Sequence, residues 1–366
     1  MWTIKGSFTK ISWEEDNLDK QFLFDLLATH SPSGYEMNIQ KKWLNYIRPF
    51  ADEIKTDHAG NVIGVLNPEA NFKVLLATHC DEIGLIIKHI DEKGFLYFDK
   101  VGWINEKTLV GMHIEILTEN GVVPGVIGVN AEHLGGLKDK FSVDDLFIDC
   151  GFQSKKEAKG FVNVGDLAVY QSVAKEMKNR LIAGKALDNK ANLFIASQVL
   201  KQLSKHTCDI GVYIASTVNE ETNMRGAFYT AAGIKPNIAI VCDVTFAIDF
   251  PNVEQKKFGD VTLNKGPVIA KGSPINRPLN QFIEKSAEIA NVNLQYEITP
   301  EMTLTDADKI QFTNKGVPVA LISLPLRYMH SPIETVSIQD IEDQIKLLVQ
   351  TIRSLTGKEN FNPLEQ

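Results

Sequence analysis

Residues 212–221 read Val212-Tyr213-Ile214-Ala215-Ser216-Thr217-Val218-Asn219-Glu220-Glu221, an apolar run that ends at two adjacent carboxylates. A run of this length and composition is typical of a strand buried on both faces, as in a sheet covered by helices. Burying an unpaired charge costs several kcal/mol, so two such carboxylates need a cation, an exchangeable proton or solvent. The stretch therefore predicts a buried strand that leads into a site of chemistry.

Buried strands and amphipathic helices alternate on both sides of this stretch. The pattern predicts strands at 72–78, 210–217, 238–244 and 317–324, two helices within 19–50, and further helices around 196–203, at 280–290 and from 337 to about 355. Ser337 and Asp340 have a spacing that resembles a capping box at the start of the last helix. Alternation of this kind predicts an α/β domain.

Residues 82–173 differ from the rest, with short strands separated by turns and no long helical period. Hairpin signals stand at Asp91-Glu92-Lys93-Gly94 and at Glu119-Asn120-Gly121, between alternating apolar positions. We therefore expect a discontinuous α/β domain of residues 1–81 and 174–366, interrupted by an all-β domain of residues 82–173.

Composition excludes several classes of partner. The chain has 366 residues, of which 44% are hydrophobic, and a net charge of -8, which argues against nucleic acid as a partner. No apolar run reaches the roughly 18 residues of a membrane span, and the first residues lack the apolar stretch of a secretory signal. A cytoplasmic protein without a membrane partner is expected. The four cysteines contain no Cys-x-x-Cys pair, which indicates reduced, buried thiols.

Further candidate ligands follow the other predicted strands. In His79-Cys80-Asp81, strand alternation places His79 and Asp81 on one face, where the carboxylate could orient a ligating imidazole. By itself this pattern also fits a simple polar pair. Asp188 precedes a predicted helix, whose N-terminus favours negative charge, although an ordinary N-cap gives the same pattern. Asp243 ends strand 238–244, and His330 follows strand 317–324.

All these sites lie at the carboxyl ends of predicted strands or in the loops beyond, where ligands bind in open α/β sheets. Two histidines and several carboxylates without cysteine suit zinc, cobalt or manganese. With one bridging carboxylate, such a set can hold two metal ions. The alternative is a group of unrelated salt bridges.

Eight short segments occur in order along the chain: Ser31-Pro32-Ser33-Gly34-Tyr35-Glu36, Gly60-Asn61, His79-Cys80-Asp81-Glu82-Ile83-Gly84, Gly184-Lys185-Ala186-Leu187-Asp188-Asn189, Asn219-Glu220-Glu221, Arg225-Gly226-Ala227, Asp243-Val244-Thr245 and Arg327-Tyr328-Met329-His330-Ser331-Pro332. Together they resemble the tetrahedral aminopeptidases, also called glutamyl or deblocking aminopeptidases, metallopeptidase family 42. The resemblance spans nearly the whole chain after about residue 19. It implies a zinc-peptidase α/β domain with a mixed sheet between helices, and an inserted small β-barrel that mediates dimerisation.

The resemblance also implies a set of ligands for each of two divalent metal ions. The ions would be zinc or cobalt, with manganese as a further candidate. One ion would be held by His79, Asp188 and Asp243. The other would be held by Asp188, Glu221 and His330, so that Asp188 bridges the two. The peptide bond after Asp188 is expected to be cis.

Glu220 and Asp81 receive the catalytic roles by the same resemblance. Glu220 would act as the general base toward a metal-activated water, and Asp81 would act from behind His79. Asp306 and Arg327 are candidates for the substrate pocket, with a structural ion-pair role as the alternative for each.

Several positions depart from the pattern of the family, among them Thr222, Asn223 and Lys190. Trp103 stands where a second glycine is typical, and Leu304 and Asp308 replace small residues around Asp306. None of these positions is an implied ligand. The departures affect the expected shape of the substrate pocket.

The function expected from the sequence is hydrolysis of N-terminal residues from short peptides, in dimers that assemble into a tetrahedral dodecamer. Two other classes of protein fit the sequence less well. A glycoside hydrolase needs two carboxyl groups about 5 to 9.5 Å apart around a sugar bond, which the adjacent Glu220 and Glu221 fit poorly. A catalytically silent binding or scaffold protein is disfavoured, because no implied ligand or base is missing.

Overall fold

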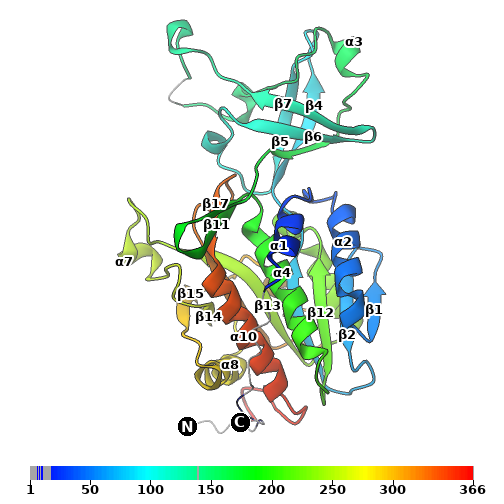
Figure 1. Ribbon diagram of the computed structural model, residues 1–366, viewed down its shortest axis with the longest axis vertical. Coiled ribbons are helices and arrows are strands. Elements are labelled where there is room, and N and C mark those ends of the chain that lie inside the picture. Colours follow the sequence, from blue (N-terminus) through cyan, green and yellow to red (C-terminus); the bar gives the residue numbers. More distant parts are fainter. Residues whose placement is uncertain (1–5, 7, 9, 11–17, 138–139, 366) are drawn as a thin grey trace.

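The apolar runs of the sequence form the middle of an eight-stranded sheet in the computed structural model, which describes residues 6, 8, 10, 18–137 and 140–365 (Figure 1). The strand order is β1-β2-β12-β3-β13-β16-β14-β15. The strands are β1 (Glu53–Thr56), β2 (Val62–Leu66), β3 (Lys73–His79), β12 (Gly211–Thr217), β13 (Ile238–Phe246), β14 (Val268–Gly272), β15 (Gln295–Thr299) and β16 (Val319–Leu326). The central strands β12, β3, β13 and β16 are parallel, and β2 and β14 pair antiparallel on either side of them.

Helices cover both faces of this sheet, because successive strand residues point to opposite faces. In β13, Ile240 and Cys242 belong to one apolar core, and Ala239 and Val241 belong to the other. The first core is covered by α1 (Lys20–Leu27), α2 (Met37–Ile47), α4 (Leu187–Leu203), α8 (Arg277–Ala290) and α10 (Ile338–Ser354), and the second by α6 (Arg225–Ile234) and α9 (Ala307–Ile310). Two short helices, α5 (Glu220–Asn223) and α7 (Gln255–Phe258), follow β12 and β13.

A closed β-barrel with its own apolar core stands at one end of the α/β domain (Figure 1). Its strands are β4 (Gly84–Ile90), β5 (Leu96–Val101), β6 (His113–Thr118), β7 (Gly121–Ile127), β8 (Ile148–Asp149) and β9 (Leu167–Tyr170), in the order β4-β5-β8-β7-β6-β9, and α3 (Lys155–Ala158) lies between β8 and β9. Both predicted hairpin turns are present; Gly94 and Gly121 in them have φ of 94° and 124°, which glycine adopts readily. The expected α/β fold with an inserted β-barrel is confirmed.

A second, three-stranded sheet was not predicted from the sequence. It contains β10 (Lys175–Met177), β11 (Leu181–Gly184) and β17 (Glu334–Ser337), in that order. Its strands are short, so their sequences carry little periodicity. The pairing of Gly184 with Glu334 brings the chain before α4 beside the segment that follows β16.

Of the predicted capping box at the start of α10, the Ser337 half is present and the Asp340 half is wrong. The Ser337 hydroxyl accepts bonds from the backbone N–H groups of Gln339 and Asp340, as a helix cap does. The Asp340 carboxylate instead accepts the N–H groups of Asn264 and Gly266, at 2.7 and 2.8 Å. Unpaired N–H groups of a loop distant in sequence therefore take the carboxylate that local spacing assigned to the cap.

All four cysteines lie in the described residues and are free thiols. Cys80 and Cys242 are buried as predicted, whereas Cys150 and Cys208 are only partly buried. None of the helices in the described part of the chain combines the length and the apolarity that crossing a bilayer requires.

Candidate active site

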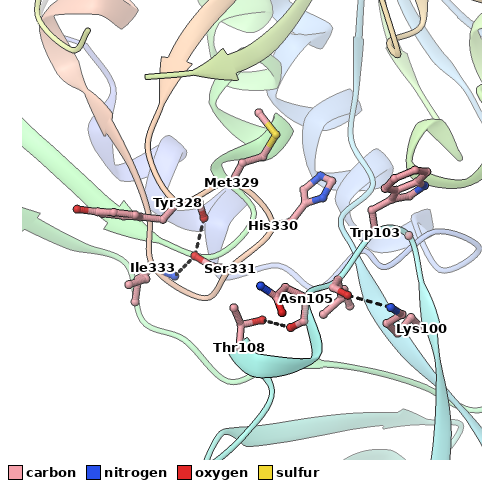
Figure 2. A pocket seen from close by; sticks show the side chains of 11 residues that line it. Lys100, Trp103, Asn105, Thr108, Tyr328, Met329, His330, Ser331 and Ile333 are labelled. Carbon is pink, nitrogen blue, oxygen red and sulfur yellow. Dashed lines mark hydrogen bonds between the residues drawn. The ribbon is translucent and has the colours of Figure 1, made fainter. Parts of the chain in front are cut away.

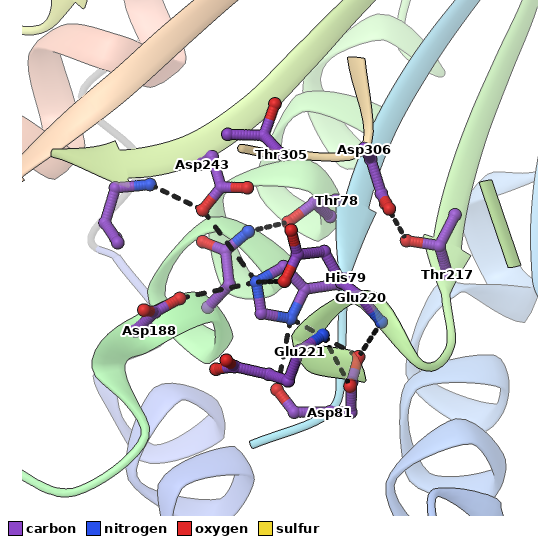
Figure 3. A network of polar contacts seen from close by, with 12 residues as sticks. Thr78, His79, Asp81, Asp188, Thr217, Glu220, Glu221, Asp243, Thr305 and Asp306 are labelled. Carbon is purple, nitrogen blue, oxygen red and sulfur yellow. Dashed lines mark hydrogen bonds and ion pairs between the residues drawn. The ribbon is translucent and has the colours of Figure 1, made fainter. Parts of the chain in front are cut away.

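The parallel strands bring the predicted site residues to one edge of the sheet (Figure 3). His79 is the last residue of β3, and Glu220 and Glu221 open α5 directly after β12. Asp243 lies inside β13, which continues to Phe246, so the predicted end of this strand was too early. His330 lies in the loop between β16 and β17. The shared direction of the strands thus gathers side chains that are far apart in sequence.

Asp188 lies between the two imidazoles. Its Oδ1 is 3.3 Å from His79 Nε2, and its Oδ2 is 3.2 Å from His330 Nε2. The Asp188–Asn189 peptide bond is cis, as expected. Asp188 and Asn189 have non-helical backbone angles, so the regular part of α4 begins after Asn189. The Asp188 carboxylate therefore faces the histidines rather than capping the helix. Burial would raise its pKa, but the two imidazoles hold that pKa well below its usual range.

The other carboxylates surround this centre on two sides. His79 Nε2 is 3.8 Å from both Glu220 Oε2 and Asp243 Oδ1, whereas His330 Nε2 is 3.5 Å from Glu221 Oε2. Single ligand atoms of His79, Asp188 and Glu221 all lie within 4.8 Å of one another. The arrangement forms one group of donors around His79 and another around His330, with Asp188 common to both.

The chemistry of this donor set fits divalent metal ions. It offers imidazole nitrogen and carboxylate oxygen without sulfur, as zinc, cobalt and manganese accept. Burial raises the pKa of Glu220 and of Glu221 well above the ordinary value, and nearby carboxylates raise both further. Glu221 Oε1 is buried and has no hydrogen-bond partner among the described residues. A bound cation would satisfy this oxygen and relieve the repulsion between the carboxylates.

Asp81 anchors both the imidazole and the glutamate pair. Its Oδ1 is 3.4 Å from His79 Nδ1, on the ring side opposite Asp188. The same carboxylate accepts the backbone N–H groups of Glu220 and Glu221 at 3.0 and 3.2 Å, and the Ser33 hydroxyl at 2.6 Å. Asp81 therefore orients the ring of His79 and also holds the turn that presents the two glutamates, a second task that the sequence did not predict.

Glu334 is a buried site residue that sequence reasoning missed. Its two oxygens accept the backbone N–H groups of Asp188 and His330, at 3.1 and 2.8 Å. Burial, strengthened by the nearby Asp188, raises the pKa of Glu334 to about 8. Strand β17 is too short to be recognised in the sequence. The only sequence feature that pointed to Glu334 is therefore its position four residues after His330.

A second group that was not predicted from the sequence consists of Glu82, Lys185 and Lys190, which lie near Asp188 in the chain or pack against that segment. Lys185 Nζ is 2.5 Å from Glu82 Oε2, and Lys190 Nζ is 2.8 Å from Glu82 Oε1. Lys190 is 0% exposed, and burial lowers its pKa to about 8, whereas the two lysines overcome burial and lower the pKa of Glu82 to about 2. Glu82 thus holds two lysines, one that precedes Asp188 in the sequence and one that follows it.

Replacing Glu82 by glutamine is expected to lower the free energy of unfolding by about 3–5 kcal/mol, because two buried ammonium groups lose their counter-charge. The measurement is urea denaturation in the presence of a chelator. Glu92→Gln is the matched control, since it breaks an exposed pair with Lys155 at the similar distance of 2.8 Å. The control should change stability far less. Equal losses in the two variants would contradict a structural role for the buried group.

The two pocket candidates have different surroundings. Asp306 is 1% exposed, and its Oδ2 accepts the Thr217 hydroxyl at 2.5 Å (Figure 3). Its Oδ1 has no hydrogen-bond partner among the described residues, and burial raises the pKa of Asp306 to about 7. Arg327 instead makes a two-pronged ion pair with Asp249, at 2.8 and 2.6 Å.

A cavity of about 820 Å³ borders the site where the barrel meets the α/β domain (Figure 2). Its walls come from the 100–108 segment after β5 and from the 328–333 loop, and His330 forms part of the wall. The ion pair with Asp188, aided by the charge of Glu334 and by the nearby Trp103 backbone, outweighs burial and raises the pKa of His330 to about 9. The site therefore opens toward the barrel.

A parallel-sheet edge with two histidines around a central carboxylate, beside an inserted barrel, defines an α/β protein with a candidate metal centre. The M42 glutamyl aminopeptidase family model matches residues 60–347. The chain therefore belongs to the M42 glutamyl aminopeptidase family and is a peptidase.

Individual relatives agree with this assignment. The lysyl aminopeptidase of Pyrococcus furiosus is 34% identical over 92% of this chain and 98% of its own length. The structure of a TET aminopeptidase from a marine sediment archaeon, Thaumarchaeota archaeon SCGC AB-539-E09, has a TM-score of 0.87 and 30% identity over 93% of this chain and 98% of that one. The Pyrococcus horikoshii TET1 peptidase, described as assembling into a tetrahedron or a large octahedral shell, has a TM-score of 0.83 and 31% identity over 92% and 99%.

Proposed function

We propose that this chain is a dinuclear metal aminopeptidase that removes N-terminal residues from short peptides. The observation that supports this most directly is the Asp188 carboxylate, which presents one oxygen to each of two histidines. One ion, zinc or cobalt with manganese as a further candidate, would be held by His79, Asp188 and Asp243, and the other by Asp188, Glu221 and His330. Such a pair of ions acidifies a coordinated water and polarises the scissile carbonyl.

The two adjacent glutamates divide the work. Following the family resemblance, Glu221, 3.5 Å from His330 Nε2, is assigned as a ligand, and Glu220, 3.8 Å from His79 Nε2, as the base. Glu220 would accept a proton from water and pass it to the leaving amine. Asp81 would keep His79 and the glutamate turn in place during both transfers.

The substrate would enter with its free amine toward the buried acidic end of the site. The unpartnered Oδ1 of Asp306 is a candidate acceptor for that amine. Arg327, held by Asp249, would border the pocket from the loop that also carries His330. The buried carboxylates favour a peptide with a positively charged N-terminus.

Acetylation of the peptide N-terminus is expected to slow cleavage by about 100-fold or more, because the buried carboxylates lose the ammonium group that compensates them. Mass spectrometry of a peptide and its acetylated form, digested with added zinc, cobalt or manganese, measures the difference. A peptide amidated at its C-terminus is the control and should be cut like the free acid. Cleavage at internal bonds of the acetylated peptide would contradict the assignment. Metal analysis of the same preparation should find up to two divalent ions per chain.

We also propose that the chain forms homo-oligomers in which the barrel joins two copies and dimers assemble into a tetrahedral dodecamer. The support is the similarity to the Pyrococcus horikoshii TET1 peptidase, which covers 92% of this chain. Light scattering should detect a species of twelve chains. A stable monomer at working concentration would refute the assembly without affecting the proposed chemistry.

A further inference from the structure

One proposed ligand, His330, lines the cavity (Figure 2). Gly102, which lines it, packs so closely on the site that a Cβ atom there would lie 3.5 Å from Glu221 Oε2 and 2.8 Å from the Ile83 side chain. The following residue, Trp103, lines the cavity together with His330, and its backbone is near enough to contribute to the raised pKa of that imidazole. The 100–108 segment therefore forms a wall of the site itself.

The walls of this cavity are mostly apolar and aromatic. The Trp103 side chain is 82% exposed, and Tyr328 and Ile333 are 40% and 59% exposed. Lys100 is already engaged, with its Nζ 2.5 Å from Glu106 Oε1 and 3.0 Å from the Ile104 carbonyl. Apart from Lys100 and His330, the lining residues are uncharged. The cavity thus suits an apolar guest better than a charged one.

The position of the cavity indicates which part of a peptide would reach it. The acidic end of the site, with Asp243 and Asp306, is buried at 5% and 1% exposure, so the amine of the first residue belongs there. The rest of the peptide must leave on the more open side. His330 lies on that side, and the exposed Trp103 stands next to it.

We propose that this cavity, which we name the Trp103 pocket, binds the side chain of the second residue of the peptide and selects peptides with an aromatic or large apolar residue there. The proposal rests on the proposed aminopeptidase function and adds a preference on the far side of the cleaved bond. A second residue of this kind would cover the exposed indole and remove apolar surface from water. Glycine at the same position would leave the indole exposed.

Kinetics on matched dipeptide amides test the pocket. With X as the N-terminal residue that an aminoacyl-amide panel shows to be preferred, wild-type enzyme should cleave X-Phe-amide with a kcat/KM about tenfold or more above that for X-Gly-amide. Trp103→Ala should lower this ratio toward one, and Trp103→Phe should keep most of it. Ile333→Ala, on the wall formed by the 328–333 loop, should lower the ratio by a smaller factor. Since Trp103 acts on His330 through its backbone, these side-chain substitutions leave that effect in place.

Phe312→Ala is the control for loss of an exposed aromatic side chain, because Phe312 is 79% exposed and does not line the pocket. It should leave the ratio unchanged. An unchanged ratio in Trp103→Ala, with both peptides still cleaved, would overturn the pocket and leave the aminopeptidase function standing. Failure of wild-type enzyme to cleave any amide or peptide would overturn both. Dissociation of the assembly by Trp103→Ala in light scattering would show that a second copy of the chain covers the indole, which also overturns the proposal.

Discussion

Replacing Glu220 by glutamine is expected to lower kcat for peptide hydrolysis by about 10²- to 10⁴-fold while bound metal is retained. Glutamine keeps the size of the side chain and the backbone bond to Asp81, but it cannot accept and return a proton. The ligands around His330 and Asp188 are untouched, so metal content measured by mass spectrometry should equal that of wild type. The loss should therefore appear in kcat, with a far smaller change in KM.

Glu69→Gln is a suitable control for this substitution, because Glu69 is exposed and lies outside the site. It should have wild-type kinetics. If Glu220→Gln lost metal together with activity, Glu220 would be a ligand rather than a proton carrier. Full activity with full metal content would refute the assigned base.

Replacing Asp188 by asparagine is expected to abolish hydrolysis by removing the shared ligand. Asparagine presents one oxygen and one NH₂ group, so it can no longer offer an oxygen to each side of the His79 and His330 pair. Loss of a residue that merely supports a ligand weakens metal binding by about 10- to 100-fold, and loss of the bridging ligand should exceed this. Metal content should fall from two ions per chain to one or none.

Thermal unfolding gives a second measure of the same variant. Metal that binds only the folded state stabilises it by about 2.7 kcal/mol at a concentration one hundred times Kd. Added zinc or cobalt should therefore raise the Tm of wild-type protein and have little effect on Asp188→Asn. Asp209→Asn, the same substitution at an exposed residue, should respond to metal like wild type. An equal metal-dependent rise in Asp188→Asn would contradict a bridging role.

The most predictable elements were strands whose side chains are buried on both faces of the sheet. Strands buried on both faces need apolar side chains throughout, so 72–78, 210–217, 238–244 and 317–324 were recognisable without a structure. Weaker patterns failed. The edge strand β15 and the short strands β10, β11 and β17 were not predicted, because few residues leave little periodicity and all of these strands except β17 are partly buried or exposed.

The sequence by itself determined which acidic and imidazole residues follow the buried strands, and parallel strands must bring their carboxyl ends to one edge. Only the tertiary structure decided what supports them. Glu334 meets Asp188 across 146 residues of sequence, and Lys190 meets Glu82 across 108. No local pattern encodes such partners, because a carboxylate takes whichever N–H or ammonium group the packing leaves unpaired beside it.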